Sequence, residues 1–424
     1  MKRLASVLSS MPDYRPDSLA LEDARRIIHA MVDAVTESES VALREALDRT
    51  LAEEVVSSID VPGHDSSAMD GWALRGSDLG AEHETALREV GVAYAGHPFQ
   101  GAVGKGECVR IMTGAVMPRG ADTVVMQEFV RVHEGQVLVP PGQRTGMNRR
   151  FAGEDMAKGQ AALPAGTIVT PAAIGLAASL GMTQLSVRRR LRVAFFSSGD
   201  ELTRLGEPLQ PGQVYDSNRH ALWALLTRLG CDTRDLGVVR DDPRALERAL
   251  REGAAWADAV VTTGGASEGE ADFTRQIAAG LGEVAFWKLA ARPGRPFAFG
   301  RIFAGNAGAL FFGLPGNPVA AMVCFYRLVR PALLALAGAR TLEPLMVRMR
   351  AAEPMRMRVG REETLRGIAS RDEAGECVVR LTGAQGSAMM NSVCGANCLV
   401  VLPREIGEVR LGDWVDVILL EGLV

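Results

Sequence analysis

Histidine is scarce in this sequence, and its positions exclude one common kind of active site. The chain has 424 residues but only six histidines, all at or before His220. An α/β-hydrolase carries its nucleophile in a G-x-S-x-G turn and needs a histidine later in the chain. Ser267 fits that turn, between Gly265 and Gly269, but no histidine follows it. The sequence therefore argues against a serine nucleophile. It also lacks H-E-x-x-H and a Walker A loop.

Cysteines and long apolar runs are also few. The six cysteines form no C-x-x-C, and no histidine follows Cys394 and Cys398 to complete a zinc site. No uninterrupted apolar run reaches the roughly 18 residues of a membrane span, and the N-terminal apolar stretch is too short for a secretory signal. A net charge of -4 gives no support to nucleic-acid binding. We expect a cytoplasmic protein without disulfides, bound to neither membrane nor nucleic acid.

The pattern of apolar residues changes along the chain and divides it into segments of different secondary structure. Residues 19–35 have the apolar spacing of a helix, and short apolar pieces alternate with glycine turns from about 85 to 140. From 190 to 338 strands alternate with helices, which predicts a parallel, three-layer α/β domain. After Gly338 the helical period gives way to short strands. The fold class predicted is multidomain α/β plus β, with a three-layer α/β domain between a small β-rich domain and a small C-terminal β domain.

Three polar loops follow strands of the α/β region: SSGDEL at 197–202, VRDD at 239–242 and TTGGASEG at 262–269. In open α/β sheets such loops meet at the carboxyl edge and form the ligand site. The glycine-rich turn, with Gly264, Gly265 and Ser267, predicts backbone N–H groups that hold a phosphate. The alternative is a plain strand-to-helix turn, with glycines present for steric reasons.

Acidic side chains gather in the same loops. They are Asp200, Glu201, Asp241, Asp242, Glu270 and Asp272. Carboxylates tolerate a nearby phosphate when a hard cation bridges them, which predicts a Mg²⁺ ion here, and Asp241 is the favoured functional residue. Asp242 precedes Pro243 and is instead expected to be a helix N-cap. The competing interpretation of each acid is a cap or a solvated turn.

A basic segment and a second turn complete the predicted site. Residues 286–300, FWKLAARPGRPFAFG, set Lys288, Arg292 and Arg295 among prolines and apolar residues, and arginine forks suit oxyanions. A solvated surface loop is the alternative. In GLPGNP at 313–318, Asn317 is expected to cap a helix that has Pro318 at its first position.

Seven motifs in order resemble one known family. They are DSSAMDGWAL (65–74), RIMTGAVMPRGADTVVMQE (110–128), GED (153–155), SSGDEL (197–202), YDSNRHAL (215–222), TTGGASEGEADF (262–273) and GLPGNP (313–318). Together they resemble the molybdopterin molybdenumtransferase family, MoeA, whose relatives include the catalytic end of gephyrin. The resemblance implies that adenylylated molybdopterin and molybdate are converted to molybdenum cofactor and AMP, with Mg²⁺.

The resemblance also implies site residues and an assembly. Catalytic roles fall on Asp70, Thr113, Asp155, Glu201, Asp241 and Asp272, and the last three of these are the expected ligands of Mg²⁺. Substrate contacts fall on Arg150, Gly264, Gly265, Ser267, Lys288, Arg292, Arg295, Pro315, Pro318 and Ser387. Arg292 and Arg295 stand where the family usually has lysine. The positive charge is kept, but a planar guanidinium replaces a compact ammonium group.

The resemblance implies a homodimer of elongated four-domain subunits with shared active sites, in which one domain is an elongated linker and the C-terminal domain is barrel-like. Contacts with other proteins of the same biosynthesis are also expected. The predicted domains are 1–60 with 156–189, 61–155, 190–338 and 339–424. Two alternatives stay open: a molybdopterin adenylyltransferase and a non-catalytic scaffold like gephyrin.

Overall fold

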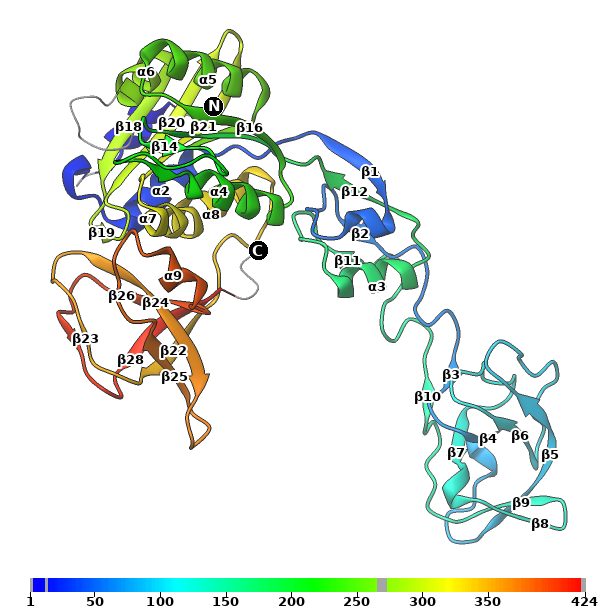
Figure 1. Cartoon of the computed structure of the whole chain (residues 1–424). Coiled ribbons are helices and arrows are strands. Elements are labelled where there is room, and N and C mark those ends of the chain that lie inside the picture. Colours follow the sequence, from blue (N-terminus) through cyan, green and yellow to red (C-terminus); the bar gives the residue numbers. More distant parts are fainter. Residues whose placement is uncertain (1–2, 12–13, 265–272, 421–424) are drawn as a thin grey trace.

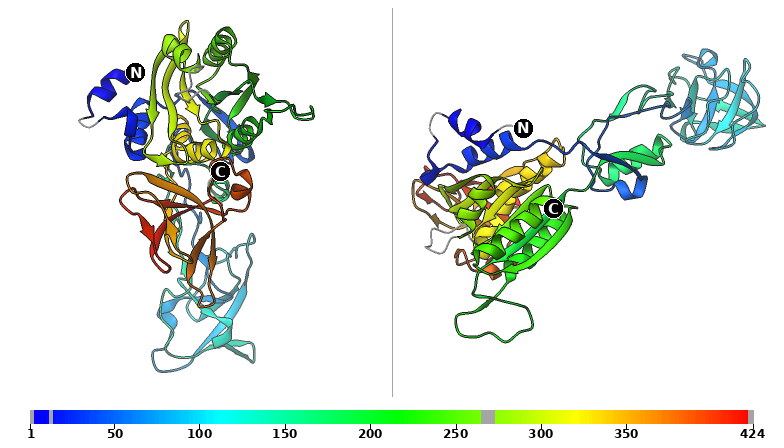
Figure 2. Two further views of the ribbon diagram at one scale, coloured as in Figure 1. Left: turned by 60° about the vertical axis from the view of Figure 1, so that its left-hand side comes forward. Right: turned by 90° about the horizontal axis from the view of Figure 1, so that it is seen from above.

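The computed structural model describes residues 3–11, 14–264 and 273–420. Its shape is elongated: an α/β body and a C-terminal β domain lie side by side, and an arm carries a small β domain far from both (Figure 1). The view from above shows the same separation (Figure 2, right). The chain runs out along the arm and returns through it, so the arm is built from two separate segments.

The body is a six-stranded sheet in the order β16 (Asp232–Val239), β13 (Arg192–Ser198), β17 (Ala259–Thr263), β21 (Ala307–Leu314), β20 (Pro296–Ala304) and β18 (Gly282–Lys288). The first four strands are parallel, whereas β20 and β18 are antiparallel to their neighbours. The central strands β17 and β21 are buried on both faces along most of their length, so their apolar residues run without alternation.

Helices cover both faces of this sheet, which confirms the predicted three-layer α/β domain. One face packs on α4 (Ser217–Arg228), α7 (Pro318–Cys324) and α8 (Arg330–Leu336). The other packs on α5 (Pro243–Trp256) and α6 (Phe273–Leu281). The Asp242 side chain accepts a hydrogen bond from Ala245 N, 2.8 Å away, so its predicted role as N-cap of α5 is confirmed.

Helices α7 and α8 join through the π-helical turn η5 (Phe325–Val329) into one segment, Pro318–Leu336. By length and composition this segment of 19 residues could cross a membrane. The sequence is expected to lack an uninterrupted apolar run of that length, and this segment agrees with the expectation because Arg327, Arg330 and Pro331 interrupt it. Within the protein 78 % of its 18-residue window is buried, and its apolar side chains belong to the main core. It is packed as a core helix.

The N-terminal helices α1 (Leu4–Ser9) and α2 (Leu21–Met31) also pack on the body, where Ile27 and Ile28 join the core of the α/β domain. The predicted segment 1–60 therefore spans two packing units. Its later part enters the arm, where β1 (Ser38–Ala42) pairs with β12 (Gln184–Arg188) and β2 (Val55–Val56) pairs with β11 (Ala161–Leu163). Helix α3 (Pro171–Ser179) covers this core. The four domain limits stay a prediction.

The small domain at the end of the arm has one sheet, in the order β7 (Thr123–Met126), β4 (Gly71–Leu74), β6 (Glu107–Ile111), β5 (Thr85–Ala93), β9 (Gln136–Val139) and β8 (Arg131–His133). Two apolar clusters lie within it, one of them around Trp72. The strands β3 (Ser66–Ser67) and β10 (Arg149–Arg150) pair where the chain enters and leaves this domain.

The C-terminal domain is a closed sheet of five strands: β24 (Glu362–Arg371), β25 (Cys377–Leu381), β22 (Met346–Ala351), β28 (Trp414–Leu419) and β26 (Cys398–Leu402). Pairing of β26 with β24 closes it, as the predicted barrel-like domain requires. The strand β19 (Ala291–Arg292), which leaves the α/β domain, adds to the edge of β24. The two domains are thus joined by backbone hydrogen bonds beside the basic segment.

Candidate functional site

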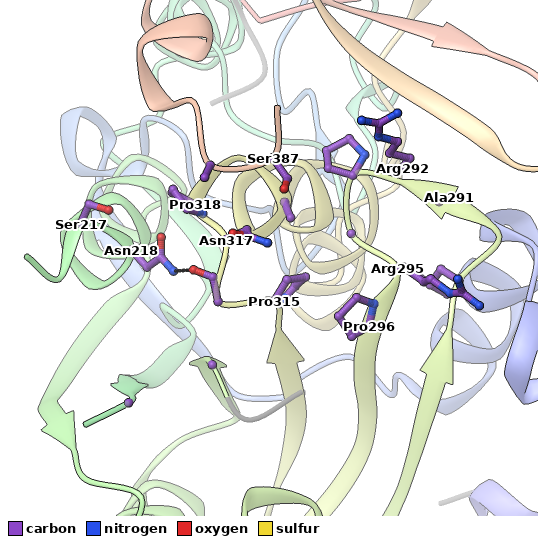
Figure 3. A pocket seen from close by; sticks show the side chains of 18 of the residues that line it. Ser217, Asn218, Ala291, Arg292, Arg295, Pro296, Pro315, Asn317, Pro318 and Ser387 are labelled. Atoms are coloured by element: carbon purple, nitrogen blue, oxygen red, sulfur yellow. Dashed lines mark hydrogen bonds between the residues drawn. The ribbon is translucent and has the colours of Figure 1, made fainter. Parts of the chain in front are cut away.

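A cavity of about 1270 Å³ lies at the carboxyl ends of β13, β16, β17 and β21, where the C-terminal domain meets the α/β domain. The strand-end loops form one side of it, and residues 358–361 and 387–388 of the C-terminal domain form the other. Figure 3 shows side chains from both domains pointing into this space. The expected ligand edge of the sheet is therefore one wall of a site that two domains build.

Eight of the residues predicted for the site line this cavity: Glu201, Asp241, Gly264, Arg292, Arg295, Pro315, Pro318 and Ser387. Lys288 ends β18, next to Leu289, which also lines the cavity. Gly265, Ser267 and Asp272 lie outside the described residues. Asp70, Thr113, Arg150 and Asp155 belong to the small domain and the strands that lead from it, so they lie away from this cavity in the same chain.

Gly264 begins the glycine-rich turn, and its conformation explains why that position carries glycine. Its φ is +84°, in the left-handed region, and an added Cβ would collide with the carbonyl oxygen of Ser198. The backbone at Gly264, directly after β17, therefore packs against the end of β13. This close approach brings the start of the TTGGASEG turn against the SSGDEL loop at the cavity wall.

A buried hydrogen-bond network fixes the same wall. Ser197 Oγ lies 2.9 Å from Asp216 Oδ1, to which it donates, and 2.8 Å from Thr263 Oγ1. Asp216, which is 1 % exposed, also caps α4 by accepting from Arg219 N, and it accepts from Arg219 Nε at 2.8 Å. Asn218 Nδ2 then donates to the Gly316 carbonyl at 2.7 Å (Figure 3). Hydrogen bonds at the start of α4 thus fix the positions of the ends of β13 and β17 and of the GLPGNP turn relative to one another.

Replacement of Asp216 with alanine is expected to lower the free energy of unfolding by about 2–4 kcal/mol. The change removes a helix cap and the buried acceptor of Ser197 Oγ and Arg219 Nε, and it leaves Arg219 only its more exposed ion pair with Asp235. Urea denaturation followed by circular dichroism measures the effect. Asp242→Ala, which removes an exposed cap from α5, is the matched control and should cost only about 1 kcal/mol. Equal losses in the two variants would show that the network around Asp216 adds nothing beyond capping.

Carboxylates face one part of the cavity. Burial raises the pKa of Asp241 above its ordinary value, and the charges of Asp200 and Glu201 raise it further. The Asp241 amide also approaches Asp200 Oδ1 at 3.4 Å. Oxygen donors crowded in this way suit a hard divalent cation. Within the described part of the chain no three such side chains stand close enough to hold a metal, and the predicted ligand Asp272 lies outside that part.

Asp241→Asn is expected to stabilise the protein at neutral pH. A carboxyl whose folded pKa is raised favours folding below its unfolded pKa, and this contribution is lost as the pH rises through the folded pKa. The neutral amide avoids that loss, so the melting temperature of the variant should exceed that of the wild type at pH 7 and converge with it near pH 4. Thermal melts at both pH values, without divalent metal, test this. A variant less stable at pH 7 would contradict it.

Guanidinium groups face the cavity from the other side. Arg292 Nη1 lies 4.0 Å from Glu363 Oε1, and Arg361 Nη2 donates to the same oxygen at 2.8 Å. Glu363 is only 3 % exposed, so it anchors both arginines from beneath. Gly294, between the two predicted arginines, has a φ of +101°, and a Cβ there would strike Cys324 Sγ. The RPGRP turn therefore rests tightly on α7 and aims Arg292 and Arg295 outward.

Ser387 enters from the C-terminal domain in a loop that docks on the first turn of α7. Its carbonyl accepts from Val319 N at 3.1 Å. The buried Arg366 shapes this loop by donating to the Gly386 carbonyl and to Ser392 Oγ. Asn317 and Pro318 occupy the N-cap and the first position of α7, as predicted. The Asn317 side chain makes no capping hydrogen bond and points into the cavity instead (Figure 3).

The small domain carries a second polar centre. Thr113 donates to Asp70 Oδ1 through its amide at 2.7 Å and its hydroxyl at 2.8 Å. These two hydrogen bonds lower the pKa of Asp70 and keep it ionised. The pair forms because β4 and β6 are neighbours, and Asp70 precedes one strand while Thr113 follows the other. Both side chains are exposed, as are Arg150 and Asp155.

Sequence reasoning missed four residues that shape the cavity: Asp216, Asn218, Arg358 and Arg361. The first two lie in YDSNRHAL, where an aspartate before a helical run was a readable capping signal. The two arginines had no comparable signal. They lie in a β-rich segment more than 60 residues from the RPGRP turn, and only the pairing of β19 with β24 brings them near it.

Comparisons with known proteins cover nearly the whole chain. Residues 19–181 match the family model described as MoeA N-terminal region (domain I and II), and residues 194–335 match the one described as probable molybdopterin binding domain. Residues 348–420 match the MoeA C-terminal region (domain IV).

Among curated proteins, molybdopterin molybdenumtransferase of Haemophilus influenzae is 40 % identical over 94 % of this chain and 98 % of its own length. A protein of the same name from Nostoc sp. is 36 % identical over 95 % of this chain and 93 % of its own. The crystal structure of a molybdopterin biosynthesis MoeA protein from Pyrococcus horikoshii superposes with a TM-score of 0.80 at 26 % identity, covering 95 % of this chain and all of that one.

Proposed function

This chain belongs to the molybdopterin molybdenumtransferase family, MoeA, and is a transferase of molybdenum cofactor biosynthesis; we propose that it uses molybdate and adenylylated molybdopterin, and releases AMP. The observation that carries the proposal is the division of the large cavity into a cationic and an acidic part. Arg292, Arg295 and Arg361 suit oxyanions on one side, and Glu201 and Asp241 suit a cation on the other.

A pyrophosphate-linked substrate fits this arrangement. The breaking phosphoanhydride bond leaves a negative charge on the AMP phosphate, and fixed cationic donors stabilise such a charge as it develops. Molybdate is itself an oxyanion, so it needs N–H, O–H and cationic groups, which Arg292, Arg295 and Ser387 provide. We assign the turn at Gly264, with Gly265 and Ser267 beyond it, to the pterin phosphate.

The acidic part fits Mg²⁺ by its donor chemistry, because burial and then the charges of Asp200 and Glu201 raise the pKa of Asp241, and a cation would relieve that repulsion. Glu201 and Asp241 would hold the ion, with Asp272 as the third ligand predicted by resemblance. The ion would supply neutralising charge beside the pyrophosphate. The carboxylates themselves keep molybdate away from this part of the cavity and direct it toward the arginines.

Asp70 and Thr113 lead to the proposed assembly. They lie far from the large cavity of their own chain, at the end of the arm, although resemblance assigns them to the active site (Figure 1). We propose a two-fold homodimer in which the small domain of one chain closes the cavity of the other, with Arg150 and Asp155 beside it. We place the protein in the cytoplasm, where it would meet other proteins of cofactor biosynthesis.

The test compares substrates in parallel incubations. Adenylylated molybdopterin with molybdate and Mg²⁺ should give AMP, whereas omission of molybdate or of the metal should abolish most of its release. Incubation of molybdopterin with ATP distinguishes the alternative adenylyltransferase, which would form pyrophosphate. A scaffold would do neither. Release of AMP at the full rate without molybdate and metal would overturn the proposed function.

A further inference from the structure

A second cavity, of about 350 Å³, lies at the other end of the helices that build the large one. Helix α4 contributes Ser217 and Asn218 to the large cavity and Arg228 to the small one. The segment Pro318–Leu336 likewise begins at the large cavity and passes Arg330 at the small one. At about 1.5 Å per residue, the two cavities are separated by roughly 18 Å of helix.

The walls of this second cavity are rich in arginine. Six guanidinium side chains line it, whereas Asp48 is its one lining carboxylate among the described residues; the arginines are Arg49, Arg188, Arg189, Arg190, Arg228 and Arg330. They come from the arm, from the strand leading into the α/β domain and from two helices. We call this space the arginine cavity. Such a concentration of like charge is costly unless anions neutralise it.

Carboxylates of the protein neutralise part of this charge. Arg49 pairs with Glu39, and Arg189 pairs with Glu37 and Asp258. Arg188 and Arg190 instead donate to backbone carbonyls, those of Thr36 and Gly230 respectively.

Arg330 is the least satisfied member of the set. Its Nε is buried and has no hydrogen-bond partner among the described residues. Burial lowers the pKa of Arg330, and the charge of Glu343 only partly offsets this. An unsatisfied donor of this kind is costly to bury.

Helix capping explains one of these contacts but leaves the rest unexplained. A cation near the last turn of α4 offsets the negative end of the helix, and the bond from Arg190 to Gly230 serves that purpose. Capping of α4 does not explain why Arg188 and Arg330 also line the arginine cavity. Guanidinium forks from separate elements that converge on a space of this size are instead suited to an oxyanion.

We propose that the arginine cavity binds a compact tetrahedral oxyanion, of the class of phosphate and molybdate, with Arg190 and Arg330 as principal donors. The bound anion joins the arm, α4 and α8, and so ties together the two helices whose other ends form the large cavity. This site does not depend on the proposed reaction, because it is defined by anion binding alone.

Calorimetric titration with inorganic phosphate tests the site in the full-length chain. Arg292→Gln combined with Arg295→Gln serves as the background, because these changes weaken anion binding in the large cavity. One binding event should persist in that background. Adding Arg190→Gln or Arg330→Gln should weaken it at least about tenfold, the usual effect of losing a charge-assisted hydrogen bond. Arg251→Gln, an exposed change on α5, should leave it unchanged.

Parallel titrations with molybdate and with AMP identify the anion, since AMP should bind more weakly if the cavity takes only a free tetrahedral ion. Arg330→Lys, which keeps the charge, should retain part of the affinity and controls for folding, and thermal melts report whether each variant is native. The proposal is overturned if the background variant binds no phosphate, or if a natively folded Arg190→Gln, Arg330→Gln double variant binds it as the background does.

Discussion

Turnover should fall by about two to four orders of magnitude when Arg292 and Arg295 are both replaced with glutamine. Each side chain offers a charge-assisted fork to an oxyanion, and loss of one such hydrogen bond costs about 1.5–3 kcal/mol. The two residues lie on one tight turn that Gly294 and Cys324 hold in place, so the exposed guanidinium groups can change without disturbing the core. Initial rates of AMP release at varied molybdate measure the loss.

The double lysine variant is the control for this result. Arg292→Lys with Arg295→Lys keeps both charges but replaces the planar forks with point charges. We expect it to retain activity to within about tenfold, because the resemblance places lysines at these positions. If the glutamine variant keeps more than half of the wild-type rate, the basic turn has no part in the reaction.

Activity should return when two inactive variants are mixed, which is the second large effect expected. Asp70→Ala removes the acid at the end of the arm, and Asp241→Ala removes one in the large cavity of the body. If the site is shared across a two-fold dimer, about half of randomly paired dimers are mixed, and each of them has one intact site. Roughly a quarter of all sites should then be active after joint refolding.

Subunit exchange must be verified independently for this experiment. Affinity tags of two kinds on the two variants, followed by tandem purification, isolate the mixed dimers. Mixed dimers as inactive as either parent would place both acids in the site of one chain. The fully wild-type dimer, unfolded and refolded in the same way, sets the scale for recovered activity.

Local sequence signals predicted the α/β domain well because each is complete within a few residues. The Asp242–Pro243 pair marks the start of α5, and the ends of β13, β16 and β17 do meet at one edge, with Ser198, Asp241 and Gly264 lining the same cavity. Asn317 shows the limit of this reasoning. It occupies the N-cap position of α7, but its side chain lines the cavity and makes no capping hydrogen bond. The orientation of that side chain depends on the neighbouring loop and not on the helix.

Contacts between distant segments were beyond the reach of the sequence. Arg361 enters the cavity because β19 adds to β24, a pairing between strands about 70 residues apart. The helices α1 and α2 pack on the α/β domain, although the residues after them belong to the arm. The position of Asp70 relative to the large cavity was likewise hidden, because no local pattern encodes the length and direction of the arm.

The most direct test of the proposed function follows both products in a single turnover. Enzyme in excess over adenylylated molybdopterin, with molybdate and Mg²⁺, is quenched at intervals, and AMP and pterin-bound molybdenum are quantified in the same samples. Our account predicts that the two appear at the same rate and in equal amounts. Release of AMP without molybdenum on the pterin would contradict it, because the cavity would then serve hydrolysis and not insertion.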